Sequence, residues 1–200
     1  MTVTSDQGIS VAPGSRRGTG DLEARLFARV LTGDRVAFEE LYRLYHPRLT
    51  RFLLHLVRRP TLVEEVLNDT MLVVWNRADS FNGASKLSTW IFAIAYRKAM
   101  KGVRRQDEAV EDRDADARVS PDPGPEAQSA QHRLHALLVH AMDELSPAHR
   151  AVIDLTYFHE LGYREIATIL DCPVDTVKTR MFHARRHLRR RLAGEFSDWI

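Results

Sequence analysis

Apolar residues recur at helical spacing along almost the whole chain, and this periodicity constrains the fold more than any other feature. Leu22, Leu26 and Val30 are spaced at steps of four residues, and steps of three and four return from Phe38 onward. Such spacing places apolar side chains on one face of a helix, where they can be buried together. The sequence therefore predicts an all-α protein.

Local signals predict where several helices begin and end. Gly33-Asp34 combines a helix-stopping glycine with an N-capping residue. Pro47 lies inside the apolar run that follows, and it is expected either to kink that helix or to restart it. Further along, Ser146-Pro147 supplies an N-cap with proline at the first helical position.

Two more helices are expected in the first half of the chain. The segment 61–64, TLVE, matches a capping box, so a helix is predicted from there to about Asp79. After the loop FNGAS, the apolar face begins at Leu87 and the next helix is predicted to run to about Arg105. The first domain is therefore expected to be a helical bundle.

The periodicity stops between the two halves of the chain. The segment 106–128 holds eight acids, two arginines and three prolines, and its other residues offer almost no apolar surface. The chain is therefore expected to form two small helical domains joined by a flexible acidic linker. The predicted division is a disordered tail at 1–20, a first domain at 21–106, the linker at 107–129 and a second domain at 130–194.

The net charge of +2 hides an uneven distribution. Six lysines and arginines and no acid lie within 80–106, and seven cations with one acid lie within 173–192. The acidic linker separates these two blocks. The arrangement indicates contact with polyanions at two places.

The segment 163–192 has the pattern of a helix-turn-helix. A short apolar face ends at Asp171-Cys172-Pro173, and an inner stripe then runs from Val174 through Met181 to Leu188. In this motif the second helix enters the major groove and flanking cations bind phosphates. The alternative is an ordinary solvated basic helix face, but its crowded cations would repel one another unless phosphates neutralised them.

The basic block at 80–106 has a different character because aromatic residues are interleaved with its cations. Cations with stacking rings suit single-stranded nucleic acid, since bases stack on the rings while the cations follow the backbone. The alternative for Trp90 and Phe92 is that they are core residues.

Other functional classes find little support in the sequence. Cys172 is the single cysteine, which excludes an intramolecular disulfide and favours a reducing compartment, the cytoplasm. The histidines lack a metal-ligand spacing, and we find neither a glycine-rich phosphate loop nor a nucleophile motif. No stretch approaches the ~20 apolar residues of a membrane span. We therefore expect no metal or other cofactor, no catalysis and no membrane insertion.

Four segments in this order resemble bacterial RNA polymerase sigma factors of the extracytoplasmic-function type. They are DRVAFEELYRLYHPRL, VEEVLNDTMLVVW, SFNGASKLSTWIFAIAYRKAMKGVRR and LSPAHRAVIDLTYFHELGYREIATILDCPVDTVKTRMFHARRHLRRRL. The resemblance covers about residues 25–192. It implies a region 2 domain that binds core polymerase and captures the −10 promoter element, and a region 4 domain that binds the −35 element as duplex.

The resemblance also implies roles for individual residues. The clamp helices of the polymerase beta-prime subunit would be contacted by Glu65, Asn68 and Asp69. The single-stranded −10 element would be bound by Phe81, Asn82, Gly83, Ser85, Lys86, Trp90, Arg97, Lys98 and Lys101. The −35 duplex would be bound by Thr176, Lys178, Thr179, Arg180, Phe182, His183, Arg185 and Arg186.

The chain departs from the usual family pattern at a few positions. Arg97 stands where asparagine is common, and Leu87-Ser88 replaces a common aromatic or Phe-Arg pair, so −10 base specificity does not carry over. His183 stands where arginine is frequent, which would either weaken a guanine contact or make it pH-dependent near neutrality. Further implied partners are the beta flap of the polymerase and an anti-sigma factor, and the free protein is expected to be a monomer.

Two other functions remain open from the residues themselves. One is a stand-alone helix-turn-helix regulator whose first domain senses a signal or dimerises. The other is a helical interaction or adaptor protein whose basic faces bind acidic partners.

Overall fold

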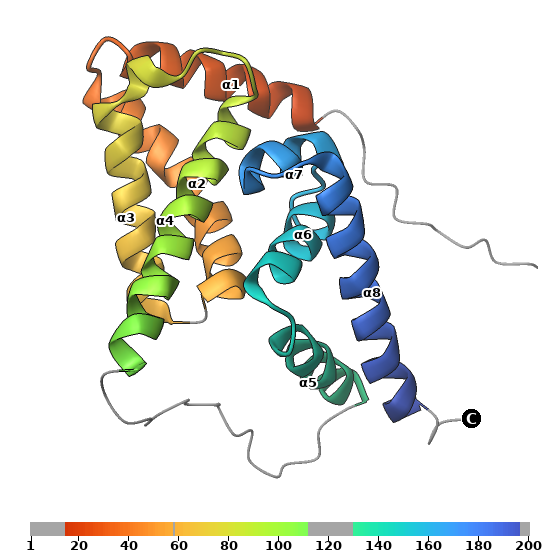
Figure 1. Ribbon diagram of the computed structural model, residues 1–200. Helices are drawn as coiled ribbons and strands as arrows, with labels where there is room; N and C mark the ends of the chain where they lie inside the picture. Colours follow the sequence, from red (N-terminus) through yellow and green to blue (C-terminus); the bar gives the residue numbers. More distant parts are fainter. Residues whose placement is uncertain (1–14, 58, 112–129, 197–200) are drawn as a thin grey trace, which may run out of the picture.

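The computed structural model describes residues 15–57, 59–111 and 130–196, and in these ranges every regular element is a helix. The predicted all-α class is confirmed. Figure 1 shows the elements in chain order: α1 (Ser15–Val30), α2 (Arg35–Val57), α3 (Pro60–Asn76), the 3-10 turn η1 (Ala78–Ser80), α4 (Leu87–Glu111), α5 (Ala130–Asp143), α6 (Pro147–Tyr157), α7 (Tyr163–Leu170) and α8 (Val174–Phe196).

Helices α1 to α4, here called the N-terminal half, form one bundle around α2. This helix packs against α1, α3 and α4, and α3 also packs along α4. The largest side chains buried among them include Tyr45, Phe52, Leu67 and Ile91. Removing apolar surface from water at about 25 cal/mol per Å² is what holds such a bundle together.

Helices α3 and α4 approach each other closely at Gly102. A Cβ atom at this position would lie 2.9 Å from Cδ1 of Leu62, closer than carbon atoms pack. A larger residue would therefore force the Leu62 side chain to move where α3, which carries the predicted polymerase contacts, packs on α4, which carries several of the predicted −10 residues.

Two local predictions are confirmed at the turn between α1 and α2. Gly33 adopts the left-handed conformation with φ 81°, which glycine does without steric cost. Asp34 then caps α2, because its Oδ1 accepts the amide hydrogens of Val36 and Ala37 at 2.9 and 3.1 Å. Hydrogen bonds from the Ala37 amide and from Arg29 hold the pKa of Asp34 below its ordinary value.

The capping box predicted at the start of α3 is wrong. The helix begins at Pro60, so its N-cap is Arg59, two residues before Thr61, and Arg59 makes no side-chain capping bond. Proline at the first helical position lacks an amide hydrogen that would be left unpaired there in any case, and its ring fixes a helical φ. The regular helix also ends at Asn76 rather than near Asp79, which lies in η1.

Other boundaries differ from the sequence expectations. Pro47 lies inside a continuous α2, so it neither ends nor restarts the helix. Helix α1 begins at Ser15, within the predicted tail, and α4 continues to Glu111, past the predicted start of the linker. The rest of the predicted tail, 1–14, and of the linker, 112–129, lies outside the described residues.

Helices α5 to α8, here called the C-terminal half, pack around α8, which contacts α5, α6 and α7. Ser146 caps α6 as predicted, since its Oγ accepts the amide hydrogen of His149, and Pro147 follows at the first helical position. Asp171 ends α7 in the left-handed conformation with φ 49°. The predicted break between the two helices of a helix-turn-helix is therefore confirmed.

The two halves lie side by side and in contact (Figure 1). Helix α7 packs against α4, and α6 packs against α2, while α3 and α8 lie on the outer sides of the molecule. Among the described residues, none of the helices combines the length and apolar character needed to cross a bilayer.

Candidate nucleic-acid interface

Helix α8 buries one stripe and exposes a basic face, as a recognition helix would. Val177, Met181 and Ala184 of the predicted inner stripe are buried. Of the residues predicted to bind duplex DNA, Thr176 and Arg180 are half-buried. The exposed ones are Lys178, Thr179, Phe182, His183, Arg185 and Arg186.

Intramolecular partners orient several of these side chains. Arg185 donates from Nε to the hydroxyl of Tyr157 at 2.9 Å, and its guanidinium lies 5.6 Å from the centre of that ring. Lys178 pairs with Asp175 at 2.9 Å. Neither partner was identified from the sequence. For Asp175 the signal was its i,i+3 spacing from the lysine, whereas nothing local links Tyr157 to Arg185 across 28 residues.

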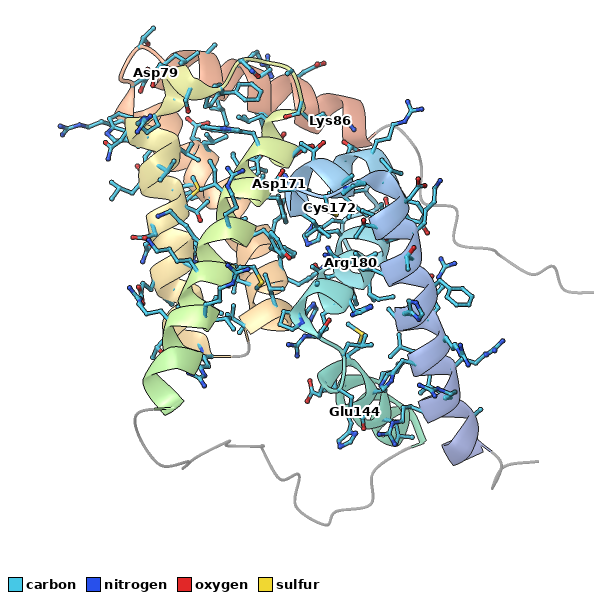
Figure 2. The ribbon with its side chains drawn as sticks, in the orientation of Figure 1. Asp79, Lys86, Glu144, Asp171, Cys172 and Arg180 are labelled. Atoms are coloured by element: carbon cyan, nitrogen blue, oxygen red, sulfur yellow. The ribbon has the colours of Figure 1, made fainter. Side chains whose placement is uncertain are left out.

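Arg180 faces away from the exposed face of α8, toward the N-terminal half. Its Nη1 donates to Sγ of Cys172 at 3.6 Å (both are labelled in Figure 2). Arg180 also lies near Tyr96 of α4. Burial raises the pKa of Tyr96, and the positive charge of Arg180 lowers it. In this arrangement Arg180 does not share the surface of Lys178 and Arg185.

A histidine cluster lies beside α8. His149 of α6 packs near His183 with ring centres 6.4 Å apart. Burial lowers the pKa of His149, and the neighbouring Arg180, His183 and His187 lower it further. Within the described ranges, however, no three His, Cys, Asp or Glu side chains form a set that could hold a metal ion.

The far end of the basic stretch on α8 is used within the protein. Glu144, just after α5, lies 2.5 Å from Arg191 and 3.0 Å from His187 (Figure 2 labels Glu144). This carboxylate therefore holds α5 against α8. Arg191 stays 58% exposed in this pair and Arg189 and Arg190 are exposed beside it, so this end of the basic stretch still faces solvent.

The loop between η1 and α4 is held in place by aromatic packing. The rings of Phe27, Phe81 and Trp90 lie 5.3 to 5.9 Å apart in edge-to-face and tilted contacts. Phe81 and Trp90 are both half-buried by this packing. The rings thus anchor the loop to α1, which favours the core reading of Trp90 that the sequence left open.

The tip of this loop is exposed and has a defined turn. The side-chain oxygen of Asn82 accepts the Ala84 amide hydrogen at 3.0 Å. Gly83 lies between them with φ 71°, a conformation that residues with side chains rarely adopt. Ser85 is half-buried and donates to the Lys86 carbonyl at 3.3 Å. The side chain of Lys86 pairs with Glu165 of α7 at 2.8 Å, and Figure 2 shows it where the loop meets the C-terminal half.

More cations of α4 have acidic partners than the local sequence indicates. Arg97 and Lys101 are exposed, but Lys98 pairs with Asp69 at 2.9 Å. Arg105 pairs with Glu65 at 3.1 Å. Counting charges along 80–106 missed these acids because they lie on α3, a different helix.

The predicted polymerase contacts lie together on the exposed side of α3. Glu65 and Asp69 pair with α4 as described above, and Asn68 accepts from the hydroxyl of Tyr42 at 3.1 Å. Beside Asn68 a groove of about 440 Å³ opens between α2 and α3. It is lined by Arg35, Phe38, Tyr42, Asn68, Met71, Leu72 and Trp75.

The apolar character of this groove was missed by the sequence analysis. Leu72 is 55% exposed at its edge, and Phe38 and Trp75 form a pair with ring centres 5.0 Å apart. The available signal was Leu72, an apolar residue on the solvent side of α3. A helical repeat, however, does not show how the neighbouring helix packs and therefore where a groove forms.

Comparisons with known proteins agree with this geometry. The family model described as sigma-70 region 2 matches residues 41–109, and the model described as sigma-70 region 4 matches residues 135–188. The first match covers most of α2 together with α3 and α4. The second covers the helix-turn-helix.

Individual relatives match over most of their length. The ECF RNA polymerase sigma factor RpoE of Cereibacter sphaeroides is 30% identical over 163 residues, which are 80% of this chain and 88% of the relative. The RNA polymerase sigma-H factor of Pseudomonas aeruginosa is 27% identical, with coverage of 87% and 95%. The solved sigma factor RpoE of Bartonella quintana, in complex with the anti-sigma factor NepR, has a TM-score of 0.64 and 26% identity over 78% of this chain and 96% of that one.

The chain has both matched regions, on a helical fold shared with a solved sigma factor. It therefore belongs to the sigma-70 family of RNA polymerase sigma factors, in the extracytoplasmic-function group.

Proposed function

We propose that this sigma factor binds core RNA polymerase through the groove side of α2 and α3, and that its two halves then contact the two promoter elements. The observation that carries the proposal is the placement of three separate surfaces on one chain. They are the groove beside Asn68, the exposed loop tip at Asn82 and Gly83, and the basic face of α8.

The −35 duplex is assigned to the exposed face of α8. Lys178, Thr179 and Phe182 lie in the first turns of this helix, the part that reaches base edges in a helix-turn-helix. Arg185 and Arg186 lie behind them and are assigned to phosphates. Thr176 and His183 complete the proposed set, and Arg180 would join it only after turning away from Cys172.

The single-stranded −10 element is assigned to the loop tip and the exposed side of α4. Asn82, Gly83 and Lys86 are exposed, and Ser85 is half-buried beside them. Arg97 and Lys101 extend the basic surface along α4 and would follow the strand backbone. Lys98 is held by Asp69 and would contribute less, while Phe81 and Trp90 support the loop from below.

Core polymerase is assigned to the face that combines Glu65, Asn68 and Asp69 with the apolar groove. Interfaces bind tightly where an apolar centre is surrounded by polar groups, and Leu72 and Trp75 supply that centre here. We place the proposed contact with the beta-prime clamp helices on this face. The beta flap would contact the C-terminal half.

Further partners and properties follow from the family. A solved relative is bound to an anti-sigma factor, and we propose an anti-sigma factor as a partner of this chain too. The protein would act in the cytoplasm, as a monomer when free, with neither catalysis nor a cofactor of its own. The alternative of a stand-alone regulator is less well supported, because it gives no role to the groove between α2 and α3.

In vitro transcription with core polymerase on a promoter library tests this proposal. We expect start sites that depend on the protein and share two upstream sequence elements. Lys178→Glu should lower −35-dependent starts at least about ten-fold, because it replaces a phosphate or base contact by a repulsive charge. The matched control, Arg25→Glu on α1, makes the same charge change outside the proposed surfaces. Active core enzyme with no protein-dependent start site would overturn the proposal.

A further inference from the structure

A buried carboxylate joins the two halves of the molecule. Asp154 of α6 has a side chain that is 1% exposed, and its Oδ1 lies 2.5 Å from Nδ1 of His55 on α2. Its other oxygen lies 3.3 Å from Nε2 of His159, which follows α6. Burial alone would raise the pKa of Asp154, but the facing imidazole rings of His159 and His55 hold it below its ordinary value.

His159 itself is inserted into the N-terminal half. Its side chain is 7% exposed and makes edge-to-face contacts with Phe92 and Phe52, at ring distances of 4.7 and 6.1 Å. The next residue, Glu160, adopts a left-handed backbone with φ 51°, which costs a non-glycine residue energy. A strained turn thus presents a polar ring of the C-terminal half to the aromatic core of the other half.

An ion pair also crosses the junction, at the proposed −10 surface. Oε1 of Glu165 pairs with Lys86, while its Oε2 accepts the Gly162 amide hydrogen at the start of α7. Lys86 is assigned above to the −10 strand. A DNA phosphate and the Glu165 carboxylate would therefore compete for the same ammonium group.

The length of a promoter is not compatible with this closed arrangement. Elements centred 10 and 35 base pairs upstream are separated by roughly 25 base pairs, or about 85 Å of B-form DNA at 3.4 Å per base pair. In the structure the loop of one half and the helix-turn-helix of the other touch, through the ion pair between Lys86 and Glu165. Both elements of one promoter can therefore be bound only after the halves separate.

We propose that Asp154, His55 and His159, together with the pair between Lys86 and Glu165, form an interdomain lock that keeps the free chain closed and its −10 surface partly occupied. The lock must open before promoter capture. This inference rests on the proposed function for its consequence in transcription, but the closed state itself is a physical property of the free chain.

Distance measurements between spin labels test the lock without any polymerase. Labels are attached to Ala24→Cys on α1 and Val139→Cys on α5, both exposed, in a Cys172→Ser background. We expect one narrow distance for the otherwise unchanged chain. His55→Leu should raise the ratio of open to closed molecules at least about ten-fold, since it removes a hydrogen bond to a buried charge.

A second variant separates opening of the lock from damage to the C-terminal half. Glu165→Gln removes the charge that pairs with Lys86 but keeps an oxygen for the cap of α7, so an open-to-closed ratio about two- to five-fold higher is expected. His46→Leu on α2 and Glu39→Gln on α2 make the same chemical changes away from the junction, and both should leave the distance unchanged. A broad distance in the starting chain would overturn the lock. So would both junction variants behaving as their controls do.

Transcription supplies the functional arm. With core polymerase and a mapped promoter, Glu165→Gln should reach half-maximal transcription at about two- to five-fold lower protein concentration. An unchanged concentration in a variant that is measurably more open would contradict a role for the lock in −10 capture. If the starting chain directs no specific transcription at all, the proposed function fails, whereas the distance measurement still decides whether the chain is locked.

Discussion

Replacing Gly102 by alanine tests the close packing that places the proposed −10 helix beside the proposed polymerase helix. In a helix interior, alanine is normally more stable than glycine by about 0.5–1 kcal/mol. Here the added Cβ would lie 2.9 Å from Cδ1 and 3.4 Å from Cδ2 of Leu62, a side chain that is 2% exposed. Overpacking a filled core costs about 1–3 kcal/mol. We therefore expect Gly102→Ala to lower the free energy of unfolding by about 1 kcal/mol.

Gly20→Ala is the matched control, because Gly20 also lies inside a helix but has no atom within 4 Å of its added Cβ. This variant should raise the free energy of unfolding by about 0.5–1 kcal/mol. Urea unfolding followed by circular dichroism measures both. In a Leu62→Ala background the clash is absent, so Gly102→Ala should there become neutral or stabilising. The packing argument fails if Gly102→Ala stabilises the unaltered core as much as Gly20→Ala does.

Three further predictions concern the polar groups of the C-terminal half. Tyr157→Phe should weaken polymerase-dependent binding to a −35 duplex about two- to five-fold, since Arg185 loses the hydroxyl that orients it; equal affinity would show that this contact is incidental. Arg180→Gln should raise the pKa of His149, because Arg180 is one of the charges that lower it; an NMR titration that leaves this pKa unchanged or lower would refute the assignment. The lowered pKa of Asp154 means that its contribution to stability is fully present above its ordinary value of 3.8 and is lost as the pH falls through its lower folded value. The stability difference between the unaltered chain and Asp154→Asn should therefore shrink below about pH 4, and a difference constant from pH 3 to 6 would contradict this.

Local sequence signals predicted those parts of the fold that a few neighbouring residues decide. The inner stripe of α8 through Val177 and Met181 followed from helical spacing, and the caps at Asp34 and Ser146 followed from residues that bond to amide groups two or three positions away. The start of α3 was predicted wrongly because two local signals competed there. Proline at the first helical position prevailed over the capping box beside it.

Contacts between distant residues were beyond the sequence analysis. Lys98 was counted as an unpaired cation because Asp69, its partner, lies 29 positions away on another helix. His55 and Asp154 are 99 positions apart, and nothing in the spacing around either residue indicates the other. The groove beside Leu72 depends on how α2 and α3 pack, which a helical repeat does not determine.

Local cleavage of promoter DNA tests the central claim, that the two halves bind two separate promoter elements. In a Cys172→Ser background, a DNA-cleaving iron chelate is attached either to Ala84→Cys in the exposed loop or to Arg190→Cys on the exposed side of α8. In the complex with core polymerase on a mapped promoter, the loop probe should cut near the −10 element and the helix probe near the −35 element. The two cleavage sites should then lie roughly 25 base pairs, or about 85 Å, apart. Cleavage by both probes at one site, or a reversed order of the two sites, would contradict the account.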